Sequence, residues 1–150
     1  MKRLFISSVV CFLLCLTPFL TSVSAQESKV DLTKCITLTV KECQKIKLDF
    51  AEPSAVVWVK VTGVKDEKEE KASVNLTVSK GYESIATTIK VYGAIEMFSC
   101  SNNDENLTGI ALSLSTSLKS FSCLFNNFLN LSFDGALNLT DVACSYAQLV

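Results

Sequence analysis

The sequence predicts a mainly β protein, a small antiparallel sandwich or barrel, with one helix over residues 116–128. Short segments between residues 35 and 100 alternate apolar and polar residues, which is the pattern of strands with one buried face. Turn-forming residues separate these segments at regular intervals, as they do in sandwiches and barrels. Residues 54–64 are rich in β-branched side chains, whose stiffness suits a pleated sheet better than a helix.

Residues 1–25 have the features of a secretory signal peptide. Two basic residues precede an apolar run over residues 4–20, and the small residues Val23 and Ala25 then occupy the −3 and −1 positions of a cleavage site. The alternative is a signal anchor that stays in the membrane, which the short run and the adjacent cleavage site disfavour. We therefore expect residues 26–150 to be a single secreted β-rich domain, located outside the cell or in the lumen of the secretory pathway.

The expected mature chain is acidic and of single-domain size. Removing 25 of the 150 residues leaves 125, and removing two basic residues leaves 12 against 15 acidic ones, a net charge of −3. A nucleic-acid partner requires a basic face, and adhesion to anionic lipid does too. The composition therefore argues against both kinds of partner.

Two alternating segments open the predicted sheet. Residues 35–40 and 44–50 each place three apolar residues on one face, and a three-residue joint separates them. This arrangement predicts a hairpin. The inward-facing residues would be Ile36, Leu38, Val40, Ile46, Leu48 and Phe50.

Residues 54–64 are expected to form a central strand that contains the only tryptophan, Trp58. The mixed charged run over residues 65–71 is interpreted as a solvated loop between strands, in preference to a docking patch. Two further strands are predicted at 74–78 and 84–92, with a turn at Gly81 and Tyr82 between them.

The helix is predicted from an apolar stripe in the C-terminal part. Leucine and phenylalanine recur at steps of four, three, four and three over residues 114–128, and Ser115, Thr116 and Ser117 offer an N-cap. Residues 110–114 also alternate as a strand would, which is the competing interpretation. The stripe is a core-facing surface or the wall of an apolar ligand site, formed by Leu118, Phe121, Phe125 and Phe128.

Five cysteines remain after signal cleavage: Cys35, Cys43, Cys100, Cys123 and Cys144. An exported chain folds where disulfides form, so we expect two bridges and one unpaired cysteine. The first candidate pair is Cys35 with Cys43 across the predicted hairpin, and Cys100 would pair with Cys123 or Cys144. The odd cysteine is either buried, which we favour, or joins a second chain in a disulfide-linked dimer.

Four sequons of the form Asn-X-Ser/Thr follow the signal peptide, at Asn75, Asn106, Asn130 and Asn138. Each lies in a predicted polar loop or on the outward face of a predicted strand, where an N-glycan would be in water. Four sequons in an exported chain predict a glycoprotein.

The sequence contains no histidine, which excludes Ser-His-Asp and Cys-His hydrolases and histidine-ligated metal sites. It also has no Cys-X-X-Cys and no glycine-rich phosphate loop. We therefore expect no catalytic site, no metal and no cofactor.

Three functions are compatible with these features. The first is a secreted, glycosylated binding or recognition module that contacts another protein or a cell-surface component. The second is a carrier of a lipid or other apolar small molecule, and the third is the lumenal fragment of a longer membrane glycoprotein. The N-terminal half resembles CUB-like and other small secreted sandwiches only in its general alternation of apolar and polar residues. No specific motif is shared, so no residue role follows from that resemblance.

Overall fold

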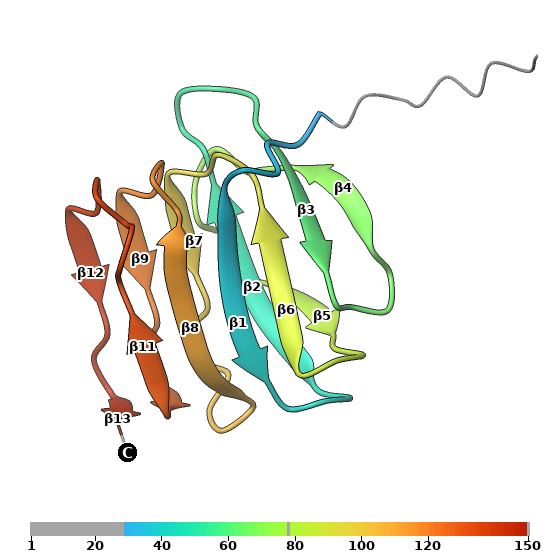
Figure 1. Ribbon diagram of the computed structural model, residues 1–150, viewed down its shortest axis with the longest axis vertical. Coiled ribbons are helices and arrows are strands. Elements are labelled where there is room, and N and C mark those ends of the chain that lie inside the picture. The colour runs from blue at the N-terminus through green and yellow to red at the C-terminus, as the bar shows by residue number, and fades with distance from the viewer. Residues whose placement is uncertain (1–28, 78, 150) are drawn as a thin grey trace, which may run out of the picture.

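The computed structural model describes residues 29–77 and 79–149, which fold into strands and connecting turns, with no helix in that part of the chain (Figure 1). The mainly β prediction is therefore confirmed. The strands are β1 (Cys35–Val40), β2 (Lys45–Ala51), β3 (Trp58–Thr62), β4 (Lys68–Lys71), β5 (Lys80–Glu83), β6 (Thr88–Tyr92), β7 (Met97–Ser99), β8 (Leu107–Leu114), β9 (Ser120–Ser122), β10 (Asn126–Phe128), β11 (Asn130–Ser132), β12 (Asp141–Ala143) and β13 (Ala147–Leu149). No helix among the described residues is long and apolar enough to cross a membrane.

Two sheets form the body of the molecule and share one apolar core. The six-stranded sheet has the order β11-β8-β1-β6-β3-β4, and the five-stranded sheet has the order β12-β9-β7-β2-β5. Strands β10 and β13 form a separate pair. Both large sheets stay open, because β11 and β4 end one of them and β12 and β5 end the other (Figure 1).

Strands β1 and β2 form where the alternation predicts them, and all six predicted inward residues are buried. The predicted hairpin between them is wrong, because β1 pairs with β6 and β8 whereas β2 pairs with β5 and β7. The turn after Val40 carries the chain from one sheet to the other. Alternation indicates which face of a strand is buried, but two strands that face each other across a core show the same pattern as two neighbours in one sheet.

The predicted central strand is confirmed as β3, which is paired on both sides, by β4 and β6. Val59 and Val61 are buried in the core as expected. The strand begins at Trp58, and residues 54–57 form a loop before it. The ammonium groups of Lys29 and Lys71 lie 4.9 and 5.6 Å from the centre of the Trp58 ring, where its negative face attracts them.

Charged and glycine-containing segments form strands that the sequence pattern missed. The run expected to be a loop contains β4, and the residues expected to turn at Gly81 and Tyr82 lie in β5. Residues 74–77 are not a strand, which contradicts the prediction for 74–78 over the residues described. Strands β4 and β5 each lie at one edge of a sheet, where charged side chains discourage pairing with another chain.

The helix predicted over residues 116–128 is wrong. This segment contains β9 and β10, and Phe125 between them has a φ of 55°. The backbone amide of Cys123 donates to Ala143 O at 2.8 Å, a partner on the next stretch of chain and not four residues back. The spacing of the apolar residues matches a helix, but the short strands and turns of this segment bury Leu118, Phe121 and Phe128 and leave Leu114 and Phe125 exposed.

Residues 97–149, here called the C-terminal solenoid, wind into stacked turns with parallel pairing. Met97 pairs with Ser120 and Ser120 with Asp141, so these turns span 120 − 97 = 23 and 141 − 120 = 21 residues. The pairs Gly109–Asn130 and Asn126–Ala147 are likewise 21 residues apart. The antiparallel expectation therefore holds for the N-terminal strands and fails here, where the strands stack as in β-helices.

A six-residue sequence repeat accompanies the stacked turns. Residues 98–103 read Phe-Ser-Cys-Ser-Asn-Asn, residues 121–126 read Phe-Ser-Cys-Leu-Phe-Asn, and residues 142–147 read Val-Ala-Cys-Ser-Tyr-Ala. The fifth residue of each copy has a positive φ: 61° at Asn102, 55° at Phe125 and 60° at Tyr146. Each copy therefore makes the same turn, with its fifth residue in the left-handed backbone conformation.

Two buried asparagines hold the corners of the first two turns. Asn126 is 1% exposed, and its Nδ2 donates to the carbonyl oxygens of Cys100 at 3.0 Å and Cys123 at 2.9 Å. Its Oδ1 accepts from the amide of Asn103 at 3.2 Å. The Asn103 side chain in turn bonds both backbone groups of Lys47, which joins the solenoid to β2.

We predict that Asn126→Ala lowers the free energy of unfolding by about 2–4 kcal/mol, because it leaves buried backbone groups without their hydrogen bonds. The adjacent Asn127→Ala should change it by less than about 0.5 kcal/mol, because Asn127 is exposed. Urea unfolding of both variants measures the difference. Equal effects would contradict the corner role of Asn126.

Candidate functional site

The four sequons all lie in described parts of the chain. Asn75, Asn130 and Asn138 are exposed, and Asn106 is partly buried. Asn130 lies in the edge strand β11, and Nδ2 of Asn138 donates to Thr116 O at 2.6 Å. The three exposed asparagines can be reached from solvent, although Nδ2 of Asn138, the atom that a glycan would modify, is hydrogen-bonded, and glycosylation stays a prediction.

Cys123 and Cys144 form a disulfide, with their Cα atoms 4.9 Å apart. Cys35, Cys43 and Cys100 are free, so the described chain has one disulfide and three free cysteines, and the expectation of two bridges and one unpaired cysteine is wrong. The predicted pairing of Cys35 with Cys43 is not formed because β1 and β2 are not a hairpin. Cys35 and Cys100 are buried, whereas Cys43 is exposed. The disulfide in the second half of the chain therefore joins Cys123 to Cys144, and Cys100 remains unpaired.

The four residues predicted to line an apolar site do not share one surface. Leu118, Phe121 and Phe128 are buried in the common core, and Phe121 stacks on Phe98 with ring centroids 6.4 Å apart. Phe125 lies on the surface instead. Three of the four are thus ordinary core residues.

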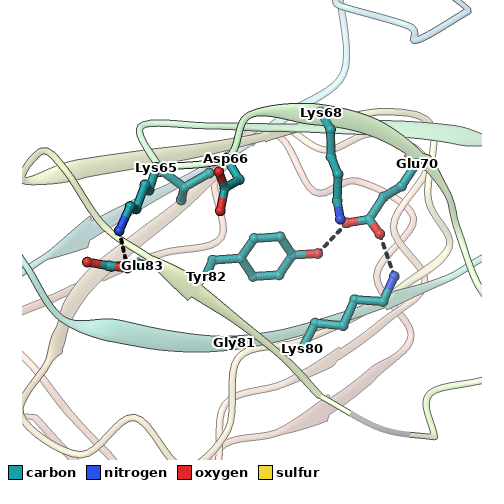
Figure 2. Close-up of a pocket in the computed structure, with 9 residues that line it drawn as sticks. Lys65, Asp66, Lys68, Glu70, Lys80, Gly81, Tyr82 and Glu83 are labelled. Carbon is teal, nitrogen blue, oxygen red and sulfur yellow. Dashed lines mark hydrogen bonds and ion pairs between the residues drawn. The ribbon is translucent and has the colours of Figure 1, made fainter.

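A polar hollow lies between β4 and β5, the edge strands of the two sheets (Figure 2). It has a volume of about 290 Å³. Its charged lining contains three lysines and three acids, with Tyr82 beside them. The lining residues are Val64, Lys65, Asp66, Lys68, Glu70, Lys80, Gly81, Tyr82 and Glu83.

Two side chains of β5, Lys80 and Tyr82, point toward Glu70 of β4 at one side of this hollow (Figure 2). Tyr82 donates to Oε1 of Glu70 at 2.5 Å, and Nζ of Lys80 lies 2.5 Å from Oε2. A second pair, Lys65 with Glu83, lies at 3.5 Å near the surface. The cluster ties the edge of one sheet to the edge of the other.

The ionisation of the cluster follows from burial and its hydrogen bonds. Burial alone would raise the pKa of Glu70, but the bonds from Lys80 and Tyr82 outweigh it and hold that pKa below its ordinary value. Burial and the neighbouring Glu70 raise the pKa of Tyr82, so the phenol keeps the proton that it donates. This arrangement suits a polar ligand with both donors and acceptors, and it offers nothing to an apolar one.

A second candidate surface is the exterior of the solenoid around the Phe125–Tyr146 stack. Six of the eleven large apolar side chains that are exposed in the described chain belong to residues 125–146. They are Phe125, Leu129, Phe133, Leu137, Val142 and Tyr146. Phe125 and Tyr146, at equivalent corners of successive turns, stack with centroids 5.0 Å apart, although they are 46% and 77% exposed.

Neither surface is marked by a local pattern that assigns it from the sequence. The alternation of apolar and polar residues is the signal that places strands, and it fails for these segments. Glu70 is predicted in a solvated loop and Tyr82 in a turn, and no local pattern marks their contact. The stacked corners could have been found from the repeat, because Phe-Ser-Cys occurs at residues 98–100 and again at 121–123. Among the described residues, no group of three or more histidine, cysteine or acidic side chains could hold a metal ion.

Acid titration tests the Glu70 cluster. Because the folded pKa of Glu70 lies below its model-compound value of 4.5, the ionised group stabilises the fold above pH 4.5, and that contribution is lost as pH falls through the folded pKa. We therefore predict that Glu70→Gln flattens the fall in stability below pH 4.5, measured by urea unfolding across pH. Glu83→Gln, which changes only an exposed ion pair, should retain the wild-type slope. A wild-type slope in Glu70→Gln would contradict the assignment.

No protein family, curated protein or solved structure matches this chain. The candidate surfaces are the polar hollow around Glu70 and the exterior of the solenoid around the Phe125–Tyr146 stack.

Proposed function

We propose that this chain is a secreted, N-glycosylated recognition module without a catalytic site, which binds another protein or a cell-surface component through the part of its solenoid around the Phe125–Tyr146 stack. In this proposal the two sheets act as an open sandwich that supports the solenoid. The observation that carries it is the exposed Phe125–Tyr146 stack within a stretch that holds six exposed apolar side chains. Exposed apolar patches and aromatic anchors are typical of protein interfaces.

The alternative, a carrier of a lipid or other apolar molecule, has less support. The phenylalanines that suggested it, Phe121 and Phe128, pack within the core, and the hollow between β4 and β5 is lined by charges. The proposed surface would serve equally well if the chain were the lumenal part of a longer membrane glycoprotein.

A disulfide-linked dimer, where one forms, would use Cys43 in this proposal. Among the described cysteines, Cys43 is free and exposed, whereas Cys35 and Cys100 are free and buried. A thiol must be reachable to bond a second chain.

Intact mass spectrometry of the secreted protein tests export, glycosylation and the carrier alternative together. We expect a chain that begins at Gln26 and loses mass on removal of N-glycans, with no lipid adduct under gentle ionisation. Single Asn→Gln changes at positions 75, 130 and 138 should each remove one glycan. An unglycosylated chain that begins at Met1 would contradict the proposal, and a stoichiometric lipid adduct would favour the carrier.

The recognition surface is tested by a binding screen against a panel of purified extracellular domains. We expect at least one protein partner, whose affinity Tyr146→Ala weakens by about 30-fold, since an interface hot spot contributes about 2 kcal/mol or more. Ile85→Ala is the matched control, because Ile85 is also an exposed apolar residue but lies outside the solenoid. A partner that responds to Ile85→Ala and not to Tyr146→Ala would place the interface elsewhere.

A further inference from the structure

Three cysteines occupy the same position in three successive turns of the solenoid. Cys100, Cys123 and Cys144 directly follow β7, β9 and β12. These strands are in register, since Ser122 pairs with Ser99 on one side and with Ala143 on the other. The ladder continues into the cysteines: the amide of Cys100 donates to Ser122 O at 2.9 Å, and that of Cys123 donates to Ala143 O at 2.8 Å. Cys123 therefore has a cysteine neighbour in the turn on each side.

Only one of these two neighbours is bonded to Cys123. The disulfide joins it to Cys144, while Cys100 is a free, fully buried thiol. Sγ of Cys100 lies 3.8 Å from the carbonyl oxygen of Ser122, the residue that precedes Cys123, so it is directed at the neighbouring turn. Adjacent strands lie about 4.8 Å apart, within the range of Cα separations that a disulfide spans.

We propose that Cys123 is shared between two alternative disulfides, and that the protein exchanges Cys123–Cys144 for Cys100–Cys123 with release of the Cys144 thiol. The Cys100 thiol gives its proton to solvent, and the resulting thiolate attacks Sγ of Cys123. The bond from Cys123 to Cys144 breaks, and Cys144 leaves as a thiolate that takes up a proton. One disulfide and one thiol are present before and after, so the step requires no oxidant or reductant.

The exchange moves the disulfide by one turn of the solenoid. In the described structure it fastens the second turn to the third, and after exchange it fastens the first turn to the second. The released thiol at Cys144 is only partly buried, in the last turn described. Burial raises the pKa of the Cys100 thiol, so its thiolate forms when the stack opens locally, and the exchange is slow in the closed structure.

The test uses the full chain with Cys43→Ser, so that the exposed thiol cannot attack. The protein is held at about pH 8.5 to favour thiolate formation, free thiols are then blocked with N-ethylmaleimide, and a non-reducing digest maps the disulfides. We expect Cys144 to become labelled over time and a Cys100–Cys123 peptide to appear in step with it. Adding Cys100→Ser should abolish the labelling of Cys144, because it removes the attacking thiol.

A second variant, Cys144→Ser, tests the alternative bond directly. We expect its secreted form to contain a Cys100–Cys123 disulfide. If that variant does not fold, the time course above decides alone, and labelling of Cys144 that persists in Cys100→Ser would overturn the proposal. Free Cys100 and Cys123 in a folded Cys144→Ser protein, or no labelling of Cys144 in the parent, would overturn it too.

Discussion

The hydrogen bonds between successive turns of residues 97–149 are the interaction on which the C-terminal half depends. Its strands, except for β8, are three residues long and too short to be stable as isolated hairpins, and each has a backbone partner one turn away in the chain. In-register stacking then places the same type of residue at the same position in successive turns. It aligns the phenylalanines in the core, the asparagines at the buried corners and the cysteines beside them.

The same stacking joins this half to the antiparallel N-terminal half. Strand β7 pairs with β2 and strand β8 pairs with β1, so the first turn of the solenoid extends both sheets and the two halves share one core (Figure 1). At the opposite side, charged β4 and β5 end the sheets, and Glu70 ties them together. The molecule thus has a charged edge held by a polar cluster, and its later turns carry six exposed large apolar side chains.

The sequence predicts the strand faces well and their neighbours poorly. Alternation over Ile36–Val40 and Val59–Val61 indicates burial correctly, because side-chain direction depends only on the local period of two. It does not indicate that β1 and β2 lie in different sheets. The helix over residues 116–128 is wrong because its spacing of three and four counts Phe125, which lies at an exposed corner, together with the buried Leu118, Phe121 and Phe128. The Glu70–Tyr82 contact depends on two edge strands meeting, which no local sequence pattern indicates. The repeated Phe-Ser-Cys, in contrast, is visible in the sequence and could have predicted the stacked turns.

Disulfide mapping of the native protein, with free thiols blocked before digestion, tests the stacked arrangement most directly. Stacking places Cys123 next to both other solenoid cysteines, so it predicts a Cys123–Cys144 peptide, with any second form being Cys100–Cys123. Cys100 and Cys144 lie two turns apart, about 9.6 Å, which exceeds the span of a disulfide. A Cys100–Cys144 peptide, or a link from Cys123 to Cys35 or Cys43, would contradict the account.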